Sequence, residues 1–153
     1  MTVQLARHTI WIDRPRTDVF DFFADFSQAP RWRQYVESMA LVGPGPLGVG
    51  SRVRTVISLH GGRHQFDLEV LAFDRPALWR HRTFESDFNG YIEYRFETEG
   101  AGTRATMTIA VKPANFHGWI ALPVMWLSRN KPYVEQLPRL KSVIEAPVAP
   151  TVP

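Results

Sequence analysis

The sequence predicts one α+β domain, in which a curved antiparallel sheet of about seven strands wraps around a long C-terminal helix. Between residues 52 and 111, apolar and polar residues alternate in short runs separated by Gly-containing turns, a pattern typical of antiparallel strands. From Phe116 onward, apolar residues instead recur at steps of three and four, which is typical of a helix. The length of 153 residues fits one domain better than two.

The N-terminal quarter predicts a strand followed by two short helices. Residues 4–13 alternate as a strand, with Ala6, His8, Ile10 and Ile12 on one face. Pro15 suits the beginning of a helix whose predicted buried stripe consists of Val19, Phe22, Phe23 and Phe26. Residues 27–35 predict a second short helix or a turn, and residues 38–42 a return to strand. Residues 43–50 read as a loop, and their two prolines remove amide donors that a phosphate site would use.

Gly61-Gly62 predicts a two-residue hairpin turn, which fixes a register for its two strands. In that register His60 faces Arg63, and Arg54 lies across from Glu69. The inward pairs are then Ile57 with Phe66, Thr55 with Leu68, and Val53 with Val70. His60 and His64 point to opposite sides of the sheet, so they do not form a metal site.

Three further strands complete the predicted sheet. A turn at residues 74–77 leads into the next strand if Phe73 pairs with Leu78, with Arg82 near Glu69. Alternation then places Gly90, Ile92, Tyr94 and Phe96 inward, followed by Ala105, Met107, Ile109 and Val111 after a turn at residues 99–102. The glutamates of these strands point outward, so no inward pair of carboxylates is available for glycosidic chemistry. No serine has the sequence context of a catalytic nucleophile.

One largely apolar face, interrupted by Asn130 and Tyr133, continues through the predicted C-terminal helix. Its members are Trp119, Leu122, Trp126, Asn130, Tyr133, Leu137, Leu140 and Ile144. Pro123, Pro132 and Pro138 are expected to kink or break this helix, and the sequence leaves open which of them does so. The domain is predicted to span residues 1–145, with residues 146–153 as a Pro-rich flexible tail.

Composition excludes several classes of function. The chain has no cysteine, which excludes disulfides, thiolate zinc sites and a cysteine nucleophile. Although the formal charge is +3, the basic residues are scattered among acidic ones, which argues against nucleic-acid binding. The longest nearly apolar stretch, residues 119–127, is far shorter than a bilayer-spanning helix, so stable membrane insertion is not expected. No secretory signal is visible at the N-terminus, and a cytoplasmic location is the default expectation.

A set of short motifs adds a family resemblance over nearly the whole chain. The motifs are Ile10-Trp-Ile-Asp-Arg-Pro15, Val19-Phe20, Asp25 with Pro30 and Trp32, Gly48-Val-Gly50, Gly100-Ala-Gly-Thr103, and Leu137 with Leu140-Lys141. In this order they resemble the SRPBCC (START-like) superfamily, which includes the polyketide cyclase/dehydrase and lipid-transport group and the birch-pollen-allergen fold. The resemblance implies a helix-grip fold. Members of that superfamily serve as lipid carriers, metabolite binders and cyclases, so the fold alone does not carry one function.

The predicted site lies between the concave face of the sheet and the helix. Its expected ligand-binding residues are Phe66, Leu68, Val70, Trp79, His81, Tyr94, Phe96, Met107, Trp126, Asn130 and Tyr133. The first hypothesis is the binding or transport of a hydrophobic small molecule such as a lipid or polyketide, with no cofactor. The second is a cyclase or dehydratase-type enzyme, with His81 as acid or base and Tyr94 as a hydroxyl donor. The third is an interaction module with a filled core, and the sequence leaves a homodimer open.

Overall fold

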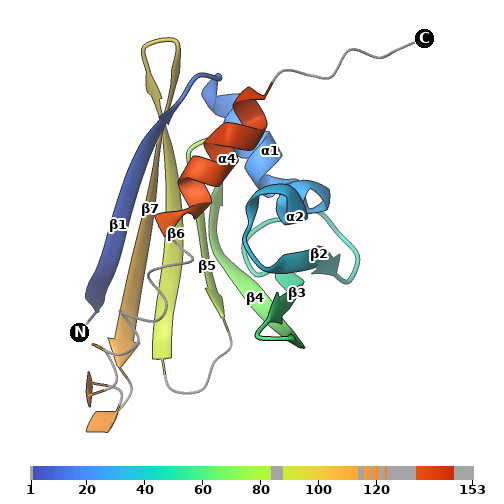
Figure 1. Cartoon of the computed structure of the whole chain (residues 1–153), viewed down its shortest axis with the longest axis vertical. Coiled ribbons are helices and arrows are strands. Elements are labelled where there is room, and N and C mark those ends of the chain that lie inside the picture. Colours follow the sequence, from blue (N-terminus) through green and yellow to red (C-terminus); the bar gives the residue numbers. More distant parts are fainter. Residues whose placement is uncertain are drawn as a thin grey trace.

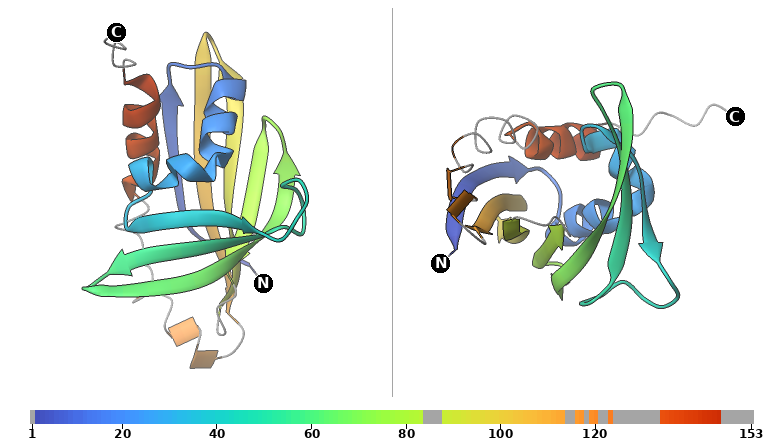
Figure 2. Two further views of the ribbon diagram at one scale, coloured as in Figure 1. Left: turned by 90° about the vertical axis from the view of Figure 1, so that its right-hand side faces the viewer. Right: turned by 90° about the horizontal axis from the view of Figure 1, so that it is seen from below.

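The computed structural model describes residues 2–83, 88–113, 116–117, 119–120, 123 and 134–146. Seven antiparallel strands form one sheet in the order β1-β7-β6-β5-β4-β3-β2 (Figure 1). The strands are β1 (Val3–Ile12), β2 (Val36–Val42), β3 (Arg52–Leu59), β4 (Gly62–Asp74), β5 (Leu78–Thr83), β6 (Phe88–Glu99) and β7 (Gly102–Pro113). The sheet curls, so that β2, β3 and β4 cross the direction of β1, β7 and β6 (Figure 2). The predicted fold class is confirmed.

The helices that the structure describes lie over one end of the concave face. They are α1 (Arg16–Ala24), the 3₁₀ turn η1 (Phe26–Gln28), α2 (Ala29–Trp32) and the C-terminal α4 (Gln136–Glu145). In Figure 1 these helices lie beside the end of the sheet where β1 finishes and β7 begins, and β1, β6 and β7 extend beyond them. The C-terminal end of α4 is tied to the chain after β1, because Glu145 accepts a hydrogen bond from the Asp13 amide at 2.7 Å.

Pro138 does not break the C-terminal helix. It is the third residue of α4, where a proline is tolerated because the amides of the first turn have no partner within the helix. Pro132 and the predicted stripe members Leu122, Trp126, Asn130 and Tyr133 lie outside the described residues. Pro123 is described, but the residues on either side of it are not.

The buried stripe of α1 differs from the prediction, because Phe20 enters it while Phe22 and Phe26 do not. Val19, Phe20 and Phe23 are buried, whereas Phe22 and Phe26 are only half-buried. Phe20 takes the inner place because its ring meets those of Phe73 and Phe96 edge-on, at centroid distances of 5.6 and 5.7 Å. The helix contacts β6, β7 and α4, and its rings also meet Phe73 on β4 and Trp79 on β5, so several neighbours set its buried arc.

The predicted register of the β3–β4 hairpin is wrong by two residues. The turn is His60-Gly61, and Gly62 already pairs with Leu59 in the ladder. Both turn residues have positive φ, 51° for His60 and 78° for Gly61, as a two-residue turn of this hand requires. Thr55 therefore faces Phe66 and Val53 faces Leu68, while Arg54 pairs with Asp67 at 3.3 Å instead of lying opposite Glu69. Because the shift is even, every side chain keeps its predicted face.

The β4–β5 pairing is also corrected, by one residue. Asp74 pairs with Leu78 and Phe73 with Trp79, because the turn holds three residues and β4 has a register irregularity between Val70 and Ala72. The expected contact between Arg82 and Glu69 is confirmed, with Nε to Oε2 at 2.7 Å.

Candidate functional site

Aromatic rings fill the space between the helices and the sheet. Phe23 on α1 is central, with ring centroids 5.6 Å from Trp79, 4.6 Å from Tyr94 and 5.3 Å from Phe96. Trp32 on α2 adds a ring 5.6 Å from that of Phe23. These five side chains are almost completely buried. We call this packed region, defined by Phe20, Phe23, Trp32, Trp79 and Phe96, the closed half of the concave face.

Several inward side chains farther along β3, β4, β5 and β6 are less covered, although Ile109 and Val111 on β7 are buried. Ile57 on β3, Phe66 on β4, Thr83 at the end of β5 and Ile92 on β6 are only half-buried, although alternation turns them to the concave side. We call this region, defined by Ile57, Phe66, Thr83 and Ile92, the open half. Figure 2 shows that α1, α2 and α4 are gathered at the other end of the sheet.

The structure brings most of the predicted site residues to the concave face. Buried there are Leu68, Val70, Trp79, His81, Tyr94, Phe96 and Met107, and Phe66 is half-buried. Trp79 and Phe96 pack against the rings of α1, so they belong to the closed half. Trp126, Asn130 and Tyr133 lie outside the described residues. His81 and Tyr94 occupy the boundary between the two halves.

His81 is a neutral hydrogen-bonding residue in an apolar setting. It is 4% exposed and pairs with Val70 and Ile92 on the neighbouring strands. The indole Nε1 of Trp79 donates to His81 Nδ1 at 2.8 Å, which places the proton of the neutral imidazole on Nε2. Burial, together with the nearby positive charge of Arg33, lowers the pKa of His81 to about 3. His81 therefore presents Nε2–H as a donor at neutral pH.

Tyr94 connects the sheet to the C-terminal helix. Its hydroxyl donates to Oε1 of Gln136 at 2.6 Å, and Gln136 is the first residue of α4. Both side chains are buried. The imidazole of His81 is nearly parallel to the Tyr94 ring, with centroids 6.3 Å apart and an angle of 24° between the planes. The beginning of α4 is thus fixed at the boundary by one buried hydrogen bond.

Sequence reasoning missed Arg33. Its side chain is only 6% exposed and turns into the interior. The guanidinium carbon lies 4.3 Å from the ring centroid of Trp32, 5.1 Å from that of Phe23 and 5.8 Å from that of Tyr94. Arg33 follows α2 directly and precedes β2, so neither strand nor helix periodicity gives a signal for its direction. Gln136 was missed for a similar reason, because it is a polar residue next to the apolar stripe of the helix.

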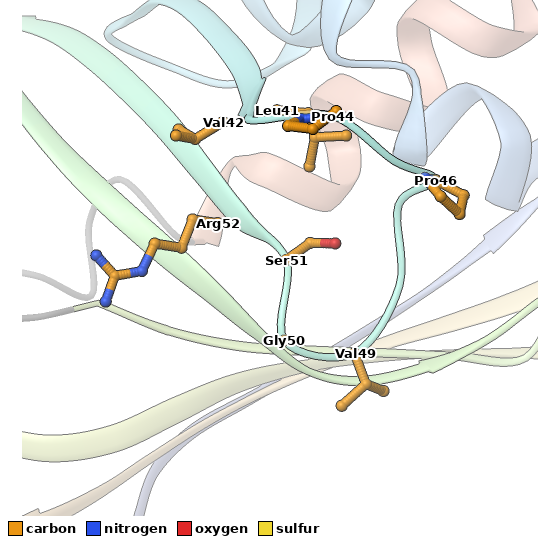
Figure 3. A pocket seen from close by; sticks show the side chains of 8 residues that line it. All are labelled: Leu41, Val42, Pro44, Pro46, Val49, Gly50, Ser51 and Arg52. Carbon is orange, nitrogen blue, oxygen red and sulfur yellow. The ribbon is translucent and has the colours of Figure 1, made fainter.

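A separate surface pocket lies at the turn between β2 and β3 (Figure 3). It has a volume of about 470 Å³ and contains none of the predicted site residues. Its lining consists of Leu41, Val42, Pro44, Pro46, Val49, Gly50, Ser51 and Arg52. The Ser51 hydroxyl already accepts a hydrogen bond from the Gly48 amide at 3.0 Å, and Arg52 and Val49 point away from the centre of the loop (Figure 3). This pocket offers little to orient a ligand.

Within the residues that the structure describes, no three His, Asp or Glu side chains gather in a way that could hold a metal ion. Among the described helices, none has both the length and the apolar character needed to cross a bilayer.

The chain shares its fold with proteins of known structure. TTHA0849 from Thermus thermophilus is 21% identical, with a TM-score of 0.70 over 94% of this chain and 97% of that one. The Zhui aromatase/cyclase from Streptomyces sp. R1128 is 18% identical, with a TM-score of 0.72 over 95% and 94%. The di-domain aromatase/cyclase BexL from the BE-7585A biosynthetic pathway is 20% identical, with a TM-score of 0.71 over 96% of this chain and 51% of that one.

A search of curated proteins found no match. Residues 4–145, which include nearly all of the sheet and the whole of α4, match the family described as polyketide cyclase / dehydrase and lipid transport. This chain belongs to the polyketide cyclase/dehydrase and lipid-transport family.

Proposed function

We propose that the protein binds an apolar small molecule against the open half of the concave face. The observation that carries the proposal is that, along a single strand, side chains on the same face are buried at one end and only half-buried at the other. On β6, Phe96 and Tyr94 are buried under the helices, whereas Ile92 faces the same side and is half-buried. Such a surface gains about 25 cal/mol for each Å² of apolar area that a ligand removes from water. His81 at the boundary adds a hydrogen-bond donor that would orient the ligand.

The binding function is better supported than the enzyme function. A general acid or base works best when its pKa lies near the operating pH, and the lowered pKa of His81 leaves it neutral far below that range. The hydroxyl proton of Tyr94 is donated to Gln136 and is therefore not held ready for a substrate. His81 and Tyr94 suit the recognition of a carbonyl or hydroxyl group more than proton transfer.

The third reading, an interaction module with a filled core, describes the closed half better than the open half. Rings pack against one another around Phe23, but Ile57 and Phe66 keep partial exposure on the inward face. A uniformly filled core would leave inward apolar residues buried at both ends of the sheet.

Two neighbouring residues of β3 provide a matched test. Ile57 and Val56 are both half-buried, and they lie on opposite faces of the strand. Binding of a neutral apolar fluorophore such as N-phenyl-1-naphthylamine should weaken at least tenfold in Ile57→Asp, because a carboxylate would enter the apolar surface. In Val56→Asp the affinity should stay within about twofold of the wild type. Circular dichroism would check that both variants keep the native secondary structure.

Two outcomes would contradict the binding proposal. One is the absence of saturable fluorophore binding to the wild type, and the other is equal weakening by both substitutions. Native mass spectrometry of protein from its own host adds a second readout, since a retained small molecule is expected. If a substrate becomes known, His81→Ala should change only its affinity, whereas loss of turnover would favour the cyclase reading.

A further inference from the structure

An exposed apolar surface follows the last strand of the sheet. Phe116, His117, Trp119 and Ile120 have helical conformation, and Phe116 comes three residues after the end of β7. Residues three and four apart lie on the same side of a helix, so Phe116, Trp119 and Ile120 share one face. Phe116 is 74% exposed, Trp119 44% and Ile120 60%. We call these three side chains the exposed helix face.

The sequence gives this face no polar counterpart. Trp119 belongs to the predicted apolar stripe that was expected to face the sheet, yet much of its ring is exposed. Residues 113–128 contain no Asp, Glu, Lys or Arg, so the apolar character extends beyond one stripe. A helix that is apolar on all sides is normally buried in a protein or a membrane. Because large apolar side chains gathered on a surface mark an interaction site, a partner is expected to cover this face.

Basic residues border the uncharged stretch. Lys112 on β7 is exposed, and Arg129 and Lys131 follow the stretch in the sequence, outside the described residues. The nearest acidic residues along the chain are Glu99 and Glu135. Apolar and aromatic side chains bordered by Lys and Arg are typical of helices that lie in the interface of an anionic bilayer. A second copy of the chain would instead bring like charges together, which is unfavourable.

The exposed helix face and the open half lie at the same end of the sheet. Pro113, the last residue of β7, pairs with Phe88 at the beginning of β6, and Ile92 of the open half follows four residues later. Figures 1 and 2 show the described pieces of residues 116–123 beyond this end of β7, whereas α1, α2 and α4 are gathered toward the other end. A partner on the exposed helix face would therefore lie at the open end of the concave surface.

We propose that the exposed helix face docks the protein on the surface of a lipid bilayer that contains anionic lipids. Phe116, Trp119 and Ile120 enter the boundary between head groups and acyl chains, and Lys112 approaches the negatively charged head groups. An indole ring suits this boundary because it combines a large apolar surface with an N–H donor. The docking is peripheral, and it uses none of the residues that define the open half, so it stands apart from the ligand proposal.

Vesicle sedimentation with two matched variants tests the apolar contact. Ile120→Asp should weaken binding to phosphatidylcholine vesicles containing about one third phosphatidylglycerol at least tenfold, because a carboxylate would enter the apolar boundary. Val49→Asp is the matched control, since Val49 is 69% exposed in the connection between β2 and β3. Its affinity should stay within twofold of the wild type. Thermal unfolding should show that both variants remain folded, because both side chains are exposed.

Lys112→Gln separates the charge from the apolar contact. The wild type should bind the anionic vesicles at least fivefold more tightly than vesicles of phosphatidylcholine alone. The connection between β5 and β6 carries Glu85 and Asp87, which keeps the expected preference moderate. Lys112→Gln should weaken binding to the anionic vesicles about three- to fivefold and leave binding to the neutral ones within twofold.

Brominated phosphatidylcholine locates the contact, because bromine quenches indole fluorescence at close range. Trp119→Phe keeps an aromatic ring, so vesicle binding should stay within threefold, but the quenched part of the tryptophan emission should fall at least twofold. Trp11→Phe is the control, because the Trp11 N–H donates to the Glu99 carbonyl at 3.1 Å, at the other end of β6. That variant should be quenched as the wild type is.

Three results would overturn the docking proposal. The first is no vesicle binding by the wild type, and the second is equal weakening by Ile120→Asp and Val49→Asp. The third is unchanged quenching in Trp119→Phe, which would place Trp119 away from the bilayer. A dimer in analytical ultracentrifugation that Ile120→Asp dissociates, without any vesicle binding, would assign the face to a second copy instead. Ile57→Asp should bind vesicles as the wild type does, so failure of the ligand proposal leaves this one intact.

Discussion

The closed and open halves of the concave face are built from the same strands but differ in how far their inward side chains are buried. In the closed half, α1, α2 and α4 cover the sheet, and Phe23 contacts five other aromatic rings. In the open half, Phe66 and Ile92 point to the same side of the sheet and keep part of their surface exposed. This difference is the basis for our proposal that one end of the sheet stabilises the fold and the other binds a ligand.

The side chains at the boundary between the two halves are polar. His81 and Tyr94 come from adjacent strands, while Arg33 directly follows α2 and Gln136 begins α4. Each of these side chains is buried, so each is held by specific contacts rather than by water. Changes at these side chains should therefore affect both the affinity for a ligand and the dependence of stability on pH.

The largest effect on stability is expected when an aromatic side chain is removed from the closed half. Phe23→Ala should lower the free energy of unfolding by about 3–5 kcal/mol, because the cavity would lie among rings that cannot collapse into it. Phe66→Ala should cost clearly less, roughly 1 kcal/mol, since that side chain is half-buried. Urea denaturation of both variants measures the difference. Equal losses would mean that the two halves are packed alike.

The next effect is a pH dependence that arises at the boundary. The pKa of His81 is lowered to about 3 in the folded protein from an ordinary value of 6.5, so below pH 6.5 the unfolded chain binds a proton that the folded one does not. Stability should therefore fall as the pH decreases from 7.5 to 5, by up to about 2 kcal/mol. The lowered pKa values of Asp21, Glu37, Glu93 and Glu145 act at lower pH, so this interval isolates the histidine.

Two substitutions identify the source of this pH dependence. His81→Gln should flatten the stability profile between pH 7.5 and 5, because the titrating group is removed. His64→Gln, at an exposed position of β4, should leave the profile as it is in the wild type. A profile that stays steep in His81→Gln would assign the proton uptake to another group.

The smallest effect compares two buried threonines. Thr103 in the closed half donates its hydroxyl to the Arg14 carbonyl at 2.8 Å, so Thr103→Val should cost about 1–2 kcal/mol. Thr55 on β3 is 3% exposed, and its hydroxyl has no partner among the described residues. Thr55→Val should therefore be neutral or stabilise the protein by up to about 1 kcal/mol. Thermal unfolding compares the two directly, and a similar loss in both would show that Thr55 has a stabilising partner.

Alternation along the strands predicted which face each residue occupies, even where the register was wrong. The β3–β4 turn is His60-Gly61 instead of the predicted Gly61-Gly62, and this changes the pairing register by two residues. Thr55, Ile57 and Phe66 nevertheless still face inward. The period of a strand is two, so an even shift changes neighbours but not faces. The register itself depends on which residues adopt positive φ, and His60 gave no such signal in the sequence.

The sequence alone determined the order of the elements, the inward row that includes His81 and Tyr94, and the family resemblance, because these depend on local periodicity and on short motifs. Only the tertiary structure decided that Phe20 rather than Phe22 enters the core, that Arg33 turns inward, and that Gln136 accepts from Tyr94. Those choices depend on contacts between elements far apart in the chain. No local pattern records such contacts, since each is made only when the helices meet the curved sheet.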